Sequence, residues 1–292
     1  MSSSARVALM WLIQAQFAGY VLAKRGLPEL TLVPRDLASS PLEALAKGAA
    51  DFGVASPDQL LSSPELARDL VFVGLFMDRC PIVLVGIKGR APDNLGDIGR
   101  CRIGIWPGED TEVRAMVLAA GGNLQAATFV PLGADLAPLL DGDLDLMEAT
   151  TYNEVPHLQE RLGIDSLVIH RPVDWGVDLA KDGLVVKTAV LRDNPDLVDS
   201  VVAAVVRGWA EAIANPEAAV AAVLQADPSL EAAGQRKQLQ LILQLIDPAR
   251  PLGRPEAGAI ERAAMVHRRL GRSASAADVT LDSGPWERGR LV

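Results

Sequence analysis

Residues that could perform acid-base, nucleophilic or metal chemistry are few and widely spaced along the 292-residue chain. The three histidines, His157, His170 and His267, lie far apart, and no pair has the spacing of a helical metal site. The sequence contains no G-x-S-x-G nucleophile elbow and no phosphate-cradling glycine loop. Cys80 precedes an expected strand, but such thiols are most often simply core. The sequence therefore predicts no catalytic residue, no metal and no cofactor.

Aromatic residues offer a different chemistry, because flat rings stack on planar ligands. Only 4% of the chain is aromatic, yet several rings fall at or beside expected strand ends. These are Trp11, Phe17, Trp106, Tyr152 and Trp175. Each ring could instead fill a strand end as part of the core, and for any single residue the two interpretations are evenly balanced.

Polar side chains in the same loops could form hydrogen bonds with a heterocycle. Glu154 can accept them, and Asn153 can both donate and accept. A carboxylate in the first turn of a helix is also favoured by the helix dipole, so Glu154, Asp58 and Asp178 each keep a structural alternative. The complete predicted ligand-binding set is Trp11, Gln16, Phe17, Ser56, Asp58, Trp106, Glu109, Thr111, Tyr152, Asn153, Glu154, Trp175 and Asp178.

The turn at residues 108–111 bears on the charge of the ligand. A bare helix N-terminus binds anions. Here Glu109 and Asp110 would repel a sulfonate or phosphate, which favours a neutral or weakly cationic heteroaromatic compound. Asp110 could at the same time be an ordinary N-cap.

Alternating strands and helices must position these loops. Apolar segments at residues 7–13, 30–34, 51–55 and 70–76 are separated by helical segments, which predicts parallel strands with crossover helices. Ligands bind at the carboxyl ends of such strands. That rule selects residues 14–17 and 56–58, and later residues 106–111, 150–154 and 174–178. The segment Ser40-Pro41-Leu42-Glu43 predicts a capping box, and helices dominate after Pro195.

Composition narrows the class of protein. The net charge is −9 and no basic stripe occurs, which excludes a nucleic-acid partner. No apolar stretch reaches the roughly 18 residues that a membrane span needs, and residues 7–13 are interpreted as a buried strand rather than a signal-peptide core. Two cysteines, Cys80 and Cys101, are too few for a disulfide framework, and a bond between them stays open.

The length exceeds one ordinary core and predicts two α/β lobes. We expect lobe 1 to comprise residues 1–87 and 184–292, with lobe 2, residues 88–183, inserted into it. The tail at residues 278–292 is expected to be irregular, with Trp286 holding it down.

Several separated segments resemble one known family, the NMT1/THI5-like substrate-binding proteins, a branch of the periplasmic binding proteins of ABC importers. The segments are Trp11 with residues 16–20, the Ala-Asp-Phe-Gly stretch at 50–54, and residues 151–158, 175–177, 194–198, 208–209 and 215–217. Phe17 departs from the His or other polar residue common in pyrimidine-binding members. The cysteine-rich motif of yeast-type pyrimidine synthases is absent, which argues against that enzyme activity.

The resemblance implies a type II, two-lobed periplasmic-binding-protein-like fold with the ligand cleft between its lobes. It implies capture of a small planar molecule, first a thiamine pyrimidine precursor and then flavins, and delivery to an ABC permease. The expected location is extracytoplasmic, with the leader removed. The alternatives are a cytoplasmic biosynthetic enzyme on the same fold and a ligand-sensing domain of a larger regulatory protein.

Overall fold

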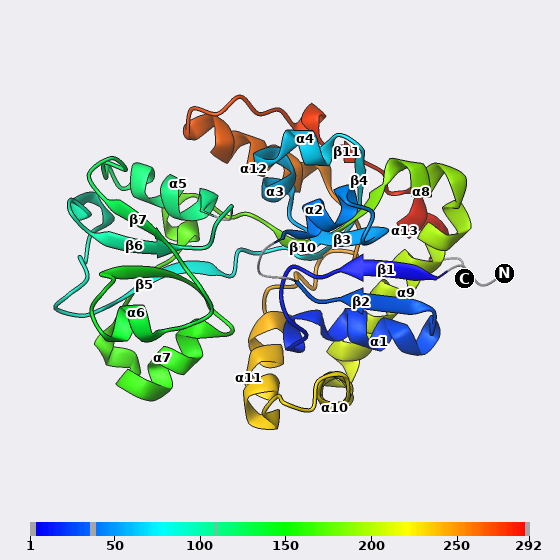
Figure 1. Cartoon of the computed structure of the whole chain (residues 1–292), viewed down its shortest axis with the longest axis horizontal. Helices are drawn as coiled ribbons and strands as arrows, with labels where there is room; N and C mark the ends of the chain where they lie inside the picture. The colour runs from blue at the N-terminus through cyan, green and yellow to red at the C-terminus, as the bar shows by residue number, and fades with distance from the viewer. Residues whose placement is uncertain (1–3, 36–38, 109, 290–292) are drawn as a thin grey trace. The chain divides into compact units, whose positions relative to one another are not determined.

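The computed structural model describes residues 4–35, 39–108 and 110–289 (Figure 1). The chain divides into two compact units. Unit 1 comprises residues 1–79, 180–263 and 275–292, and unit 2 comprises residues 80–179 and 264–274. The predicted boundaries lie at residues 87/88 and 183/184. The structure instead assigns residues 80–87 and 264–274 to unit 2 and residues 180–183 to unit 1.

Unit 1 is built on a mixed six-stranded sheet. Its strands, in spatial order, are β11 (Thr280–Leu281), β4 (Leu70–Met77), β10 (Lys181–Lys187), β3 (Phe52–Ala55), β1 (Ala5–Ala8) and β2 (Leu30–Val33). β1 is parallel to both β2 and β3, as the alternation of strands and helices predicts. β10 returns antiparallel to β3 and β4, so its first residues lie at the edge where β1 and β3 end.

Helices of unit 1 follow the expected order and dominate after residue 187. They are α1 (Ala18–Gly26), α2 (Pro41–Ala46), α3 (Pro57–Ser62), α4 (Pro64–Ala67), α8 (Thr188–Asp193), α9 (Pro195–Ala214), α10 (Pro216–Ala226), α11 (Ala232–Leu243) and α13 (Gly284–Gly289), with 3-10 turns η1 (Ala15–Phe17) and η5 (Ala276–Asp278). α12 (Ala257–Arg269) begins in unit 1 and ends in unit 2. The predicted capping box is confirmed, because Ser40 accepts from the Glu43 amide and Glu43 accepts from the Ser40 amide.

The core of unit 1 contains a close approach of α1 to α9, which lie together in Figure 1. A Cβ added at Gly208 would lie 2.0 Å from the carbonyl oxygen of Gly19, so both backbones need glycine here. Around this contact Tyr20 packs edge-on to Phe76, and Phe76 stacks on Trp209 at 6.4 Å between ring centroids. These buried rings hold α1, and therefore the loop that precedes it, on the sheet.

Unit 2 is built on a five-stranded sheet. Its strands, in spatial order, are β7 (Thr128–Pro131), β6 (Arg102–Ile105), β8 (Leu146–Thr150), β5 (Ile82–Ile87) and β9 (Leu167–His170). β6 is parallel to β7 and β8, whereas β5 is antiparallel to β8 and β9. Its helices and turns are η2 (Leu95–Asp97), α5 (Thr111–Ala119), α6 (Ala137–Leu140), α7 (Glu154–Leu162), η3 (Ile164–Ser166) and η4 (Pro172–Trp175).

Three segments differ from the sequence expectation. The strand expected at residues 7–13 is β1, Ala5–Ala8, and the chain then bends into η1. Helices were expected after Pro195, but they begin earlier, with α8 directly after β10 ends at Lys187. The expected irregular tail instead contains η5, β11 and α13.

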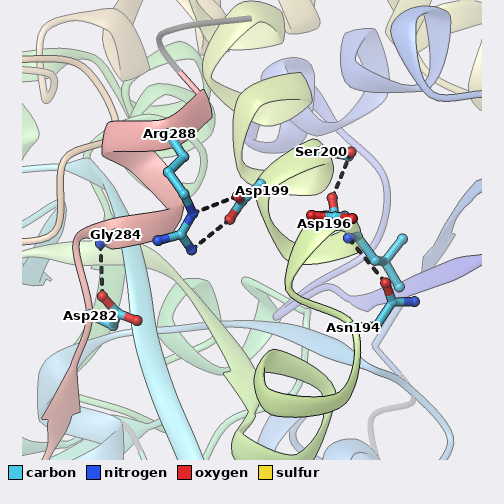
Figure 2. Close-up of polar contacts among 8 residues, drawn as sticks. Asn194, Asp196, Asp199, Ser200, Asp282, Gly284 and Arg288 are labelled. Atoms are coloured by element: carbon cyan, nitrogen blue, oxygen red, sulfur yellow. Dashed lines mark hydrogen bonds and ion pairs between the residues drawn. The ribbon is translucent and has the colours of Figure 1, made fainter.

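The C-terminal segment is held by specific contacts. Trp286 is buried and donates from its indole nitrogen to the Leu252 carbonyl at 2.8 Å. Arg288 on α13 binds both carboxylate oxygens of Asp199 on α9, at 2.6 and 2.9 Å (Figure 2). The expectation that Trp286 pins the tail therefore agrees with the structure. Within the described part of the chain, no helix combines the length and the apolar character needed to cross a bilayer.

Candidate functional site

In unit 1 the predicted loops follow β1 and β3, whose carboxyl ends share one edge of the sheet because the strands are parallel. The loop at residues 9–17 contains Trp11 and Gln16, and residues 56–58 begin α3. β10 enters the same edge in the opposite direction and brings Lys181 and Asp182, both buried, to it. The edge therefore combines predicted residues with charged groups that the prediction did not include.

Gln16 is buried and donates from its side-chain nitrogen to both carboxylate oxygens of Asp182, at 3.2 and 3.1 Å. Asp182 has a left-handed backbone, with φ of 48°, a conformation that aspartate tolerates better than most residues. The next residue has no room for a side chain, since a Cβ on Gly183 would lie 2.2 Å from the Phe72 ring. Gln16 thus orders its loop by donating to the carboxylate of Asp182, which lies at the start of the antiparallel strand β10.

The two aromatic residues of this loop have different environments. Phe17 is fully buried and packs edge-on to Tyr20 at 6.3 Å, so its ring is part of the core. Trp11 is half-buried, and the Arg35 guanidinium lies 5.8 Å from the centre of its ring. Of these two rings, Trp11 therefore keeps the features of a ligand-stacking residue.

Ser56 and Asp58 form the beginning of α3. The Ser56 hydroxyl accepts from the Gln59 amide at 3.1 Å, and the Gln59 side chain accepts from the Ser56 amide at 2.9 Å. This reciprocal pair is a capping box. Asp58 is completely buried in the first turn, where its charge is favoured by the helix dipole. The structural alternative therefore accounts for the position of both residues.

In unit 2 the carboxyl ends of β6 and β8 bring Trp106 close to Glu148. The Trp106 amide donates to the Glu148 carboxylate at 2.8 Å, and its indole nitrogen lies 3.4 Å from the Gly133 carbonyl oxygen. Glu148 is an acidic residue on a core strand, β8, and is fully buried. Trp106 and Trp175 are both partly buried and pack against one hydrophobic cluster that includes Ile82. The structure therefore gathers two of the predicted rings around one core.

The carboxylate of Glu154 is bound within its own loop. One oxygen accepts from the Thr150 amide at 2.8 Å and from the Thr150 hydroxyl at 2.6 Å, while the other accepts from the Asn153 side chain at 2.6 Å. Tyr152, in the same turn, is buried. These contacts stabilise the start of α7, which is the structural role that the sequence left open for Glu154 beside ligand binding.

At the start of α5 the charges differ from the sequence expectation. Asp110 makes no side-chain capping bond. It pairs instead with Arg114, and an Arg272 nitrogen lies 3.9 Å from its other oxygen. Arg272 also donates to the Thr111 hydroxyl at 3.1 Å. Two guanidinium groups offset the Asp110 charge, so Asp110 does not support the expectation that this turn repels an anionic ligand. The other acidic residue of that expectation, Glu109, lies outside the described residues.

The remaining predicted residue of unit 2, Asp178, accepts from the Cys80 amide at 3.0 Å. The Cys80 sulfur in turn lies 3.9 Å from a carboxylate oxygen of Glu112, which is fully buried at the start of α5. Cys80 and Cys101 do not form a disulfide. Burial, and to a smaller extent the charge of Asp145, raise the pKa of the Cys101 thiol, which favours the protonated form of that cysteine.

Sequence reasoning missed several polar residues at these edges. They are Lys181, Asp182, Gln235 and Gln238 in unit 1, and Glu112, Glu148 and Arg272 in unit 2. Glu148 could have been found, because an acidic residue inside an otherwise apolar strand indicates a bound carboxylate. Gln235 and Gln238 lie three residues apart on the face of α11 that also buries Leu239 and Ile242. Among the described residues, no group of three or more His, Cys, Asp or Glu side chains could hold a metal ion.

Solved structures share the fold of this chain at low sequence identity. A protein of Bordetella bronchiseptica is 18% identical with a TM-score of 0.76, covering 99% of this chain and 97% of its own. The zinc-bound ligand-binding component of an ABC-type import system from Staphylococcus aureus is 13% identical with a TM-score of 0.74, covering 98% and 99%. The periplasmic aliphatic sulphonate binding protein SsuA of Escherichia coli is 16% identical with a TM-score of 0.69, covering 96% and 92%.

The predicted α/β, two-unit fold of periplasmic binding proteins is thereby confirmed. A comparison with curated protein sequences gives no match. The sequence model of the family described as NMT1/THI5 like matches residues 9–219, which include the loop after β1, both sheets except β1 and β11, and α9. On this match, the chain belongs to the NMT1/THI5-like family.

Proposed function

We propose that this protein is an extracytoplasmic solute-binding protein that captures a small molecule and delivers it to an ABC permease. The observation that carries the proposal is the family match over residues 9–219. The fold supports it, since an import-system component and a sulfonate-binding protein have the same architecture over nearly the whole chain. In such proteins the ligand binds at strand carboxyl ends.

The proposed ligand is small, planar and heteroaromatic, with the thiamine pyrimidine precursors as the first candidates. Trp106 and Trp175 support it, because both rings are partly buried against one core in unit 2. Trp11 is the corresponding ring in unit 1. Each has surface that a ring system could stack on. Phe17 is not part of this proposal, since its ring is in the core.

The proposed ligand is neutral or weakly cationic. In unit 2, buried Glu112 lies in the first turn of α5, and buried Glu148 lies in the middle of β8. Asp178 adds a third carboxylate, which accepts from the Cys80 amide. A fully anionic ligand would need more positive charge than Arg272 supplies beside Asp110. An aliphatic sulfonate, the ligand class named for SsuA, is therefore the discriminating comparison.

We further propose that the protein leaves its ligand chemically unchanged. The nucleophilic form of cysteine is the thiolate. The Cys80 sulfur instead donates, as a thiol, toward the Ile82 carbonyl oxygen and a Glu112 carboxylate oxygen, each at 3.9 Å. A binding role needs no such group, whereas an enzyme of small-molecule biosynthesis would need a reactive one.

The test begins with native mass spectrometry of the purified protein and a thermal-shift screen of pyrimidines, flavins, aliphatic sulfonates, nitrate and Zn²⁺. A ligand at 100 times its Kd stabilises the folded state by about 2.7 kcal/mol, a shift that such a screen resolves. Each compound that raises Tm is then incubated with the protein and recovered for mass analysis. We expect an amino- or hydroxy-substituted heterocycle to raise Tm and to return with unchanged mass.

Two variants connect the screen to the site. Trp106→Ala should abolish the ligand-induced shift, while Trp106→Phe should retain most of it, because phenylalanine keeps a ring to stack on. Recovery of a product of different mass would refute the binding role in favour of an enzyme. A shift given only by sulfonates would refute the proposed ligand class and leave the transport role standing.

A further inference from the structure

We infer that helix α11 sets the conformation of the loop at residues 9–17, and that Gln235 and Gln238 are positioning residues for the ligand site. The inference rests on the proposed function insofar as that loop binds ligand. α11 packs directly against η1, the 3-10 turn that ends the loop. α11 spans residues 232–243, beyond the residues that the family match covers. The contact that α11 makes with the loop is therefore inferred from this chain's own residues and not from the family.

A directed series of side-chain amides connects α11 to the crossing strand β10. Gln238 donates to the Gln14 oxygen at 3.1 Å, Gln14 donates to the Gln16 oxygen at 3.2 Å, and Gln16 donates to the Asp182 carboxylate. Gln238, Gln16 and Asp182 are each buried. Four residues from three separated parts of the sequence thus form one hydrogen-bonded chain through the loop.

The carboxylate at the end of the chain determines the direction of every bond in it. A carboxylate only accepts, so Gln16 must turn its nitrogen toward Asp182 and its oxygen toward Gln14. Gln14 must then present its nitrogen to Gln16 and its oxygen to Gln238, which has to donate. The loop therefore has one hydrogen-bonding polarity, and residue 238 must be a donor.

Gln235 makes the second contact from α11, with the opposite requirement. Its side-chain oxygen accepts from the backbone amide of Ala15 at 2.7 Å. Ala15 is the first residue of η1 and is buried, so an unpaired amide there would be costly. Residue 235 must therefore be an acceptor.

Substitution by glutamate should be tolerated at position 235 and should break a hydrogen bond at position 238. Glutamate accepts but does not donate, so Gln235→Glu keeps the bond to Ala15, while Gln238→Glu loses the bond to Gln14. Gln235→Ala removes the acceptor altogether. Gln240→Glu, on an exposed position of the same helix, is the matched control for added charge.

The experiment measures backbone hydrogen exchange of residues 14–17 by NMR in the ligand-free protein. We expect Gln235→Ala to accelerate exchange at Ala15 by about tenfold, the factor for a loss of about 1.4 kcal/mol. Gln238→Glu should accelerate exchange across residues 14–17 by a similar factor, and Gln235→Glu and Gln240→Glu should stay within about twofold of wild type. Equal behaviour of Gln235→Glu and Gln235→Ala would overturn the inference, as would wild-type exchange in Gln238→Glu.

Affinity for the compound that the screen identifies is then measured for the same four variants. The expected result is about tenfold weaker binding by Gln238→Glu and Gln235→Ala, and unchanged binding by the two other variants. If no compound binds wild-type protein, the proposed function fails while the exchange experiment still decides the role of α11. If ligand binds all variants equally although exchange has changed, the positioning role for the ligand site is refuted and the proposed function stands.

Discussion

Replacing Gly208 by alanine tests the packing that holds the first predicted ligand loop. In an exposed helix, alanine is more favourable than glycine by about 1 kcal/mol. At this position the new Cβ would lie 2.0 Å from the Gly19 carbonyl oxygen and 2.9 Å from the Ala23 amide nitrogen. Since Cβ contacts shorter than 3.0 Å are essentially never seen, α1 and α9 must separate by about 1 Å.

The cost follows from what that separation disturbs. Trp209 already fits against Gly19, where an added Cβ would lie 2.3 Å from its ring, so the aromatic core cannot absorb the shift. Overpacking of this kind costs about 1–3 kcal/mol and sometimes more. The 2.0 Å contact places the cost at the upper end of this range, about 3 kcal/mol. After the gain of about 1 kcal/mol in helix propensity, we expect a net loss of about 2 kcal/mol, which lowers Tm by about 4–8 °C in a unit of this size.

The assay is urea unfolding followed by near-ultraviolet circular dichroism, with thermal unfolding in parallel. Gly234→Ala is the control, because Gly234 is also helical but its added Cβ would meet nothing within 4 Å. It should be neutral or stabilising by up to about 1 kcal/mol. Equal stability of the Gly208→Ala and Gly234→Ala variants would refute the argument that these helices are in closest contact at this position.

Three further outcomes can be checked by unfolding measurements. Burial lowers the pKa of His170, so the unfolded chain binds a proton at this residue more readily than the folded chain. The contribution of His170 to the free energy of unfolding should therefore be fully present above about pH 6.5 and be lost as the pH falls below it. In His170→Gln, the urea midpoint should lack this decline. Arg288→Ala should lose about 0.5–1 kcal/mol in low salt and less in 1 M NaCl, because the Arg288 side chain of its pair with Asp199 (Figure 2) is 51% exposed and open to screening by salt; a salt-independent loss would contradict an electrostatic origin. Ser56→Ala should cost about 1–2 kcal/mol through the lost cap of α3, whereas Ser56→Gly should cost only a few tenths of a kcal/mol.

Much of the fold could be predicted because its determinants are local. The capping box at Ser40 needs only residues within one helical turn, and the structure contains it. The alternation of apolar strands and helices predicted parallel strands, and β1 is indeed parallel to β2 and β3. Strand ends were less predictable. Residues 9–13 continue an apolar run, but tertiary contacts turn them into the bend before η1.

The candidate site was less accessible to sequence reasoning, because each aromatic or acidic residue had two roles that a sequence does not separate. Phe17 and Trp11 are both rings in one loop, yet one is core and the other is half-buried under a guanidinium. Asp110 was interpreted as a charge that repels anions, but arginines from its own helix and from residue 272 offset it. Arg272 is 162 positions away from Asp110, so no local pattern could pair them.

The sequence by itself determined the α/β class, the family and the loops at strand ends, since periodicity, capping and short motifs act over a few residues. Only the tertiary structure decided which side chains share an environment. Gln14, Gln16, Asp182 and Gln238 form one hydrogen-bonded chain because the sheet and α11 bring their backbones together. The physical reason is that hydrogen bonds and burial act over a few ångströms in space, at whatever separation along the chain the fold imposes.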